Sequence, residues 1–211
     1  MKKLMFSLCL TALSLGSKAQ SVRPAHQLNF NAGKTFSSFL FADTSGKGDE
    51  NLRYRVGNTY NMSVGFALGK RHLLRPEIHY SEMGATSTLS DVPVEWKLNY
   101  VGVGTAYLCR LNKSDSLFSL SLGALMSYDY LLKGEQMMGD TRYNLQENDA
   151  LKDWDLNAGI LLNSRFKVTE TLYLNFEYRF NVGLNQIEKK DQGEQTKNIG
   201  HKALLGLSFN L

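Results

Sequence analysis

The chain has 211 residues and a formal net charge of +4, but three of its basic residues lie within the first 18 positions. Without Lys2, Lys3 and Lys18, Lys plus Arg falls from 24 to 21 against 20 acidic residues, so the composition gives no support to nucleic-acid binding. Of the two cysteines, Cys9 lies in the same first stretch, which leaves Cys109 alone and excludes a small domain held together by internal disulfides.

The first residues have the pattern of a secretory signal peptide. Two lysines precede a short apolar run, Leu4–Leu15, and the small residues Ser17 and Ala19 occupy the −3 and −1 positions of a cleavage site. The run is too short for a membrane-spanning helix, which needs about 20 apolar residues. We therefore expect residues 1–19 to be the signal peptide and residues 20–211 to form one domain.

The stretch Leu172–Leu184 alternates between large apolar residues and mostly polar ones. A period of two predicts a β-strand with two unlike faces. The stretch is longer than the roughly 9–11 residues that a tilted strand needs to cross a bilayer. One face carries Glu177 and Arg179, which would be costly in contact with lipid. The pattern therefore predicts a strand of a transmembrane β-barrel, with its apolar face toward lipid and its charges in the lumen.

Seven further stretches alternate in the same way along the chain. They are Gln27–Phe36 (continuing through Phe41), Tyr54–Leu68, Leu73–Met83, Val94–Arg110, Leu117–Leu132, Trp154–Phe166 and His201–Leu211. The connections between them run alternately long and short, as in outer-membrane barrels with long outer loops and short periplasmic turns. We predict an all-β fold: an eight-stranded antiparallel up-and-down transmembrane β-barrel with four long outer loops and three short periplasmic turns. Two of those loops are expected at 84–93 and 133–153.

Aromatic residues near the ends of these stretches are interpreted as girdles at the two membrane interfaces. They are Tyr54, Tyr60, Trp96, Tyr100, Tyr128, Tyr130, Trp154 and Tyr178.

Charged residues of both signs fall on the face that the alternation assigns to the lumen. They are Lys34, Arg75, Lys97, Arg179 and Lys202, with Glu77, Glu95, Asp129, Asp155 and Glu177. An eight-stranded barrel is narrow enough to be filled by its own side chains, and an unpaired buried charge costs several kcal/mol. We therefore predict a lumenal ion-pair network formed by Arg75, Glu77, Lys97, Glu177, Arg179 and Lys202.

Short motifs in the chain are similar to those of one family. Arg75–Gly84 (RPEIHYSEMG) resembles the PE-x-x-Y-S-x-x-G strand end of the PorT-like outer-membrane β-barrel family. Glu177–Phe180 followed by Gly183–Ile187 resembles its E-x-R-Y…G-L-x-x-I segment, and the strand ending at Leu211 is similar to its closing strand. Where the family shows E-I-P-L, this chain has Glu95–Leu98 (EWKL). The resemblance implies a small barrel of the Gram-negative outer membrane, without an agreed activity; one member of the group is an accessory of a protein-secretion system.

The leading functional hypothesis is a non-enzymatic barrel without a cofactor, in contact with outer-membrane lipid. Either its outer loops meet an extracellular ligand or protein, or the barrel is structural and simply stiffens the membrane. A lipid-modifying enzyme is an alternative, for which His79 and Ser81 are the candidate residues because residues i and i+2 share a strand face. Two others are a soluble barrel with its apolar face inside and, with less support, a conducting pore. No metal-ligand spacing stands out in the sequence.

Overall fold

The computed structural model describes residues 26–42, 47–48, 51–89, 91–112, 117–148, 150–189 and 195–211. The predicted signal peptide, residues 1–19, lies outside these ranges. In the described part of the chain, no helix is long and apolar enough to cross a membrane.

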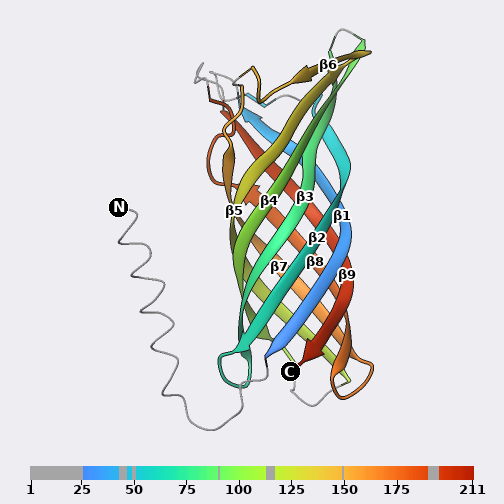
Figure 1. Cartoon of the computed structure of the whole chain (residues 1–211), viewed down its shortest axis with the longest axis vertical. Helices are drawn as coiled ribbons and strands as arrows, with labels where there is room; N and C mark the ends of the chain where they lie inside the picture. The colour runs from blue at the N-terminus through green and yellow to red at the C-terminus, as the bar shows by residue number, and fades with distance from the viewer. Residues whose placement is uncertain are drawn as a thin grey trace, which may run out of the picture.

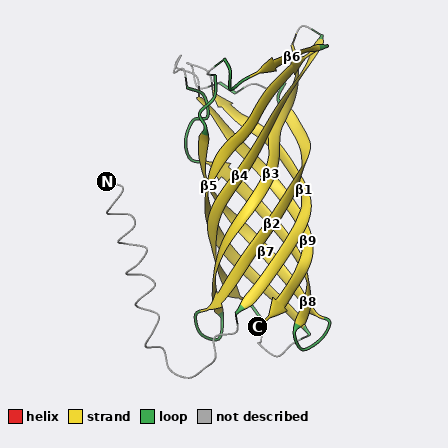
Figure 2. Ribbon diagram, in the orientation of Figure 1, coloured by secondary structure: helices red, strands yellow, loops and turns green. Residues whose placement is uncertain are grey.

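The described residues form nine antiparallel strands, eight of which close into a ring (Figures 1 and 2). The strands are β1 (Gln27–Ala42), β2 (Arg53–Ala67), β3 (His72–Leu89), β4 (Val92–Arg110), β5 (Phe118–Met138), β6 (Thr141–Asn144), β7 (Trp154–Lys167), β8 (Leu172–Gly183) and β9 (Gln195–Asn210). Neighbours in the ring follow chain order, and the first and last strands pair with each other from Gln27↔Asn210 to Ala42↔Gln195. This is the predicted eight-stranded up-and-down transmembrane β-barrel, with β6 as a short additional strand on β5.

The alternation in β8 determines which side chains face inward. Glu177 and Arg179 are 0% and 2% exposed, whereas Leu174 and Phe176, which alternate with the inward-facing positions, are 45% and 42% exposed. The apolar side chains therefore cover the outside of the ring and the charged ones point into the lumen. A soluble barrel would have the opposite arrangement, so the alternative of a soluble carrier with an apolar interior is wrong for these strands.

The barrel has two unlike ends. One end, here called the turn end, carries the connections 68–71, 111–117 and 168–171, together with the start of β1 and the end of β9. The other, here called the loop end, carries the connections 43–52 and 184–194 and the strand β6 (Figure 1). The loop end also carries the tip of the β3–β4 hairpin, where Leu89 pairs with Val92.

At the loop end, two of the segments predicted as loops contain paired β-strands instead. Residues 84–93 continue β3 and β4, which pair as far as Leu89↔Val92. The first part of 133–153 extends β5 to Met138 and adds β6 (Thr141–Asn144), and the two strands pair up to Met138↔Thr141 around Gly139 with φ +57°. These segments lack an apolar face, but strand pairing beyond the bilayer does not require one, and the polar sequence therefore suggested a loop.

Aromatic side chains form a belt on the outside of the barrel toward the loop end. Six of the eight residues predicted as girdle have exposed fractions between 40% and 53%: Tyr54, Tyr60, Tyr128, Tyr130, Trp154 and Tyr178. Tyr128 and Trp154 stack with ring centroids 5.9 Å apart. The prediction is wrong for Tyr100, which is 2% exposed, and for Trp96, which packs against the buried cluster at the loop end.

Lys34 lies outside the barrel, and its predicted place in the lumen is wrong. Its Nζ donates to Asn58 Oδ1 at 2.7 Å, and Asn58 Nδ2 in turn donates to Glu82 Oε2 at 3.0 Å. The odd-numbered residues of β1 face inward, so Lys34 faces outward. A charged cluster on the outer surface is favourable only where the surface meets headgroups or water. The cluster therefore indicates that the hydrocarbon belt ends below it.

Candidate functional site

Arg179 occupies the centre of the lumen. Its Nη1 and Nη2 donate to the two carboxylate oxygens of Glu77 at 2.5 and 2.9 Å, and its Nε donates to Glu177 Oε1 at 2.5 Å. Arg75 completes the group, since its Nη2 lies 2.6 Å from Glu177 Oε2. All four side chains are at most 5% exposed. Two guanidinium groups and two carboxylates thus neutralise one another in a water-poor interior, as buried charges require.

These ion pairs cross the lumen. Glu77 and Arg75 belong to β3, while Glu177 and Arg179 belong to β8, and three strands separate β3 from β8 in either direction around the ring. The bidentate contact between Arg179 and Glu77 therefore joins opposite walls of the barrel. We call these four residues the lumenal network.

The other two basic residues predicted for this network lie apart from it. Lys202 Nζ donates to Ser81 Oγ at 2.8 Å, and Lys202 is 3% exposed. Lys97 was predicted to join the network; instead its Nζ lies 3.2 Å from Glu95 Oε2, with both side chains 34% exposed, near the loop end. Burial alone would raise the pKa of Glu95, but hydrogen bonds from Arg55 and Lys97 hold that pKa below its usual range.

His79 and Ser81 do not form a nucleophile–base pair. His79 Nε2 is joined to Asp129 Oδ1 at 2.8 Å, whereas Ser81 Oγ accepts from Lys202 and lies 3.0 Å from Thr59 Oγ1. His79 and Ser81 are 6% and 1% exposed. A lipid substrate could reach neither group without opening the barrel wall, so the geometry does not favour lipid chemistry at this position.

Gly102 makes room for the contact between His79 and Asp129. A Cβ at this position would collide with Asp129 Oδ1 and would lie 2.7 Å from His79 Nε2. Gly102 pairs with His79 on one side and with Asp129 on the other. The bare backbone of β4 therefore lets the two side chains meet over it. The sequence showed the blurred Val–Gly alternation here but not its purpose.

Above the lumenal network, toward the loop end, hydrogen bonds continue through amides and carboxylates. Asn157 Nδ2 donates to Asp129 Oδ2 at 2.8 Å and to Asp155 Oδ2 at 3.2 Å. Asn198 Nδ2 donates to Asp155 Oδ2 at 2.7 Å and to the Tyr100 hydroxyl at 3.2 Å. Together with the lumenal network, these contacts form a layer of buried, hydrogen-bonded polar side chains inside the barrel.

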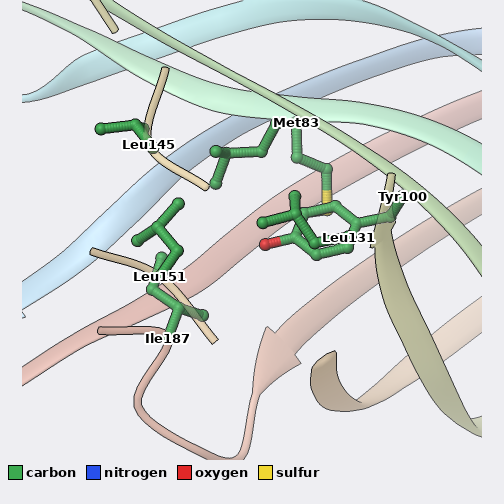
Figure 3. Packing of buried hydrophobic residues seen from close by; sticks show 7 residues of the cluster. Met83, Tyr100, Leu131, Leu145, Leu151 and Ile187 are labelled. Atoms are coloured by element: carbon green, nitrogen blue, oxygen red, sulfur yellow. The ribbon is translucent and has the colours of Figure 1, made fainter. Parts of the chain in front are cut away.

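The interior changes from polar to apolar at the loop end. Seven side chains pack there, all at most 8% exposed: Met83, Leu98, Tyr100, Leu131, Leu145, Leu151 and Ile187. Figure 3 labels six of them, with Leu145, Leu151 and Ile187 on the connecting segments and Met83, Tyr100 and Leu131 on the barrel strands. We call this group the loop-end cluster.

The segments after β6 and after β8 form a roof over the barrel mouth. Leu151 pairs with Glu188, and the backbone N–H of Lys152 donates to the Ile187 carbonyl at 2.7 Å. The N–H of Lys189 likewise donates to the Ala150 carbonyl at 3.0 Å. These bonds hold the two segments together across the end of the barrel.

A cavity of about 420 Å³ remains within this apolar layer. Phe39, Trp96 and Leu98 line it from the barrel wall, and Ala150, Leu151 and Ile187 line it from the roof. Phe39 and Trp96 pack edge to face with ring centroids 5.9 Å apart. The volume lies within the range of about 300–1,000 Å³ that is typical of small-molecule sites, and barrel mouths are a common place for them.

The outer half of β4 was assigned to the wrong face by the sequence interpretation. Leu98 and Tyr100 point inward, so their neighbours Lys97 and Asn99 do not line the lumen. At the loop end, the outside of the barrel wall faces water, while the roof offers apolar contacts on the inside. Apolar side chains therefore point inward there, whereas within the bilayer they point outward. The one available signal was the apolar content of the predicted loops, with Leu145, Leu151 and Ile187 in otherwise polar stretches.

Among the described residues, no group of three or more His, Cys, Asp or Glu side chains is arranged to hold a metal ion. Cys109 is a free thiol.

No protein-family model matches the sequence, and no curated protein matches it. Among solved structures, the chain is similar to the outer membrane protein OprG from Pseudomonas aeruginosa, with 7% identity over 89% of this chain and 97% of that chain and a TM-score of 0.52. It is also similar to a major outer membrane protein from Thermus thermophilus, with 10% identity, 89% and 100% coverage and a TM-score of 0.51. At these identities the similarity shows the fold alone: the chain has the β-barrel fold of outer-membrane proteins.

Proposed function

We propose that this chain is a non-enzymatic β-barrel of the Gram-negative outer membrane, closed to solutes, that binds a ligand or protein at the cell surface through its loop end. The observation that carries the proposal is the contrast along the barrel axis. The middle of the lumen is filled by buried ion pairs that join β3 to β8, whereas the loop end holds a cavity under a two-segment roof. A filled lumen favours binding over transport.

An outer-membrane location is supported by the surface of the barrel. Large apolar side chains cover its outside, among them Ile78, Met126, Ile160 and Leu205 with exposed fractions of 54–61%. Toward the loop end the surface carries the exposed aromatic rings and the polar cluster of Lys34, Asn58 and Glu82. Such a surface is stable in contact with lipid and would aggregate in water. Outer-membrane lipid is therefore the expected surrounding partner.

We also propose that the chain is PorT-like, since residues of the resembling motif have defined structural roles. Glu77 and Ser81 point into the lumen and hydrogen-bond to Arg179 and Lys202. Gly84 adopts φ +139°, and its backbone N–H and C=O both bond to Ser37 Oγ, at 2.9 and 3.0 Å. The motif thus links the lumenal contacts of β3 to the loop-end part of the β3–β4 hairpin, which begins at Gly84. No contact in the described residues specifically favours a role in protein secretion.

Surface labelling tests the orientation. We expect Asp140→Cys, at the tip of the β5–β6 hairpin, to react in intact cells with a maleimide that does not cross membranes, in a Cys109→Ser background. Glu170→Cys is the matched control, because Glu170 is an exposed carboxylate in the turn between β7 and β8. It is expected to react only after the outer membrane is permeabilised. The reverse pattern would contradict a loop end at the cell surface.

Conductance tests the closed lumen. In a planar bilayer we expect the wild-type barrel to show no current steps above the protein-free baseline. The double variant Glu77→Ala, Arg179→Ala removes one carboxylate and one guanidinium together, retains the Arg75–Glu177 pair and is expected to raise the conductance. Wild-type steps as large as those of the double variant would contradict the proposal.

A further inference from the structure

We infer that the loop-end cavity binds a small molecule with an apolar, preferably aromatic, body and a cationic amine. The inference deepens the proposed function, since it names the chemical class of ligand for the same end of the barrel. It is carried by the lining of the cavity: an apolar wall with one acidic side chain.

The apolar side chains that line the cavity are not fully covered by other side chains. Phe39 on β1 and Trp96 on β4 present ring surface to the cavity, and the roof adds the side chains of Ala150 and Leu151. Apolar surface around an unfilled space loses the contacts that a packed interior would supply. A ligand with an apolar body would restore those contacts, and flat rings favour an aromatic one through edge-to-face or stacked packing.

The polar part of the lining selects the charge of the ligand. Of the thirteen lining residues, Glu188 is the one with a charged side chain; the polar ones are Gln136, Asn148 and Thr196. The Thr196 hydroxyl, which is 4% exposed, donates to Glu188 Oε1 at 2.8 Å and so orients the carboxylate. An oriented carboxylate with a free lone pair is a strong acceptor for an ammonium group.

Three of the basic side chains at the loop end have acidic partners of their own. Arg55 and Lys97 both contact Glu95, and Lys189 Nζ lies 4.0 Å from Asp153 Oδ2. Within the described ranges, no Lys or Arg nitrogen lies within 4.0 Å of the Glu188 carboxylate. The lining itself therefore carries one negative charge and no positive one. A fatty acid or another anion would meet repulsion there, whereas an amine would gain an ion pair and the ring faces of Phe39 and Trp96.

Ligand exchange takes place from the loop end. The floor of this layer is Tyr100, whose hydroxyl accepts from Asn198 at the top of the polar lumen. Below it the cross-section is filled by the residues described above. A molecule that enters the cavity can leave by the same end and has no path along the barrel axis, so the site is one of binding.

The test compares three probes of matched shape: 4-phenylbutylamine, the neutral 4-phenylbutan-1-ol and the anionic 5-phenylpentanoate. The full barrel is folded in lipid nanodiscs with Trp154→Phe, which leaves Trp96 as the one tryptophan. We expect a saturable change in Trp96 fluorescence with the amine, weaker binding of the alcohol and no saturable binding of the carboxylate. Glu188→Gln should weaken binding of the amine about tenfold, because it removes a charge-assisted hydrogen bond, and should leave binding of the alcohol unchanged.

Two matched variants separate the cavity from its surroundings. Glu147→Gln removes an exposed carboxylate of the same roof that does not line the cavity and whose hydrogen-bond partner is the neutral Asn144, and it should leave the affinity for the amine unchanged. Ala150→Phe fills the cavity and should abolish binding of both the amine and the alcohol. Competition between these two probes on the unfilled barrel gives the same information without a core change. Heat-modifiability on gels verifies that each variant is folded.

Equal binding of amine and carboxylate, or an amine affinity that Glu188→Gln does not change, would overturn the inferred charge selectivity. A signal that persists in Ala150→Phe and shows no competition would overturn the site itself. These outcomes are independent of the surface-labelling result, which tests the proposed function. A barrel that binds the amine but exposes its loop end to the periplasm would disprove only the cell-surface role.

Discussion

Replacing Arg179 with alanine is expected to lower the free energy of unfolding by about 3–5 kcal/mol. Arg179 makes three hydrogen bonds to Glu77 and Glu177, and its removal leaves both carboxylates buried with Arg75 as their remaining guanidinium partner. Two negative charges in a low-dielectric interior would then be only partly compensated. The measurement is reversible unfolding by urea in lipid vesicles, followed by tryptophan fluorescence.

Three comparison variants make this result specific. Lys97→Ala breaks an ion pair that is one-third exposed and should cost less than about 1 kcal/mol. Arg179→Lys keeps the charge but loses the bidentate geometry, so its effect should fall between wild type and Arg179→Ala. Adding Glu77→Ala to Arg179→Ala should recover part of the loss, because it removes one of the stranded carboxylates. If Arg179→Ala and Lys97→Ala lowered the free energy of unfolding equally, the prediction would be wrong, because water would then compensate the lumenal charges.

Replacing Ile78 with arginine is expected to lower the free energy of unfolding by about 2–4 kcal/mol, the cost of a cation near the bilayer midplane on the lipid face of a barrel. Ile78 is 54% exposed on the outside of β3, between the inward-facing Glu77 and His79. It lies roughly midway between the turn that precedes His72 and the polar cluster that contains Glu82. The same vesicle unfolding assay measures the effect.

Leu89→Arg is the matched control for this prediction. Leu89 is also exposed, at 61%, and also lies on β3, but it is at the tip of the hairpin with β4. Because the tip extends beyond the hydrocarbon, its charge should change the stability by no more than about 0.5 kcal/mol. If both variants lost the same free energy, the assignment of the hydrocarbon belt would be wrong.

The membrane-spanning part of the fold was predictable because the bilayer imposes one rule on it. In β8 every second side chain must be apolar, so the positions of Leu174 and Glu177 follow from the alternation alone. The same rule places Glu77 and Arg179 in the lumen, because charged side chains are costly in lipid. The lumen of an eight-stranded barrel is narrow, so the two side chains are expected to lie close together. The alternation does not show which atoms pair. It therefore could not predict that Lys202 contacts Ser81 and not a carboxylate.

Beyond the bilayer the rule no longer holds, and the sequence interpretation failed there. Trp96 and Tyr100 lie on an apolar face that the membrane rule would turn outward. They turn inward because the roof segments cover the mouth of the barrel with Leu151 and Ile187. That contact joins residues about 50 or more positions apart, and no local pattern encodes it. The cavity, which depends on the fit of roof and wall, was for the same reason not predictable.

The pairing of β1 with β9 has a consequence for biogenesis. Until β9 docks, β1 has one edge of unsatisfied amides and carbonyls, which lipid cannot solvate. Partly inserted sheets with fewer strands therefore cannot rest in the hydrocarbon. A barrel that is stable in lipid therefore requires β9 to be docked on β1 along the whole seam from Gln27↔Asn210 to Ala42↔Gln195.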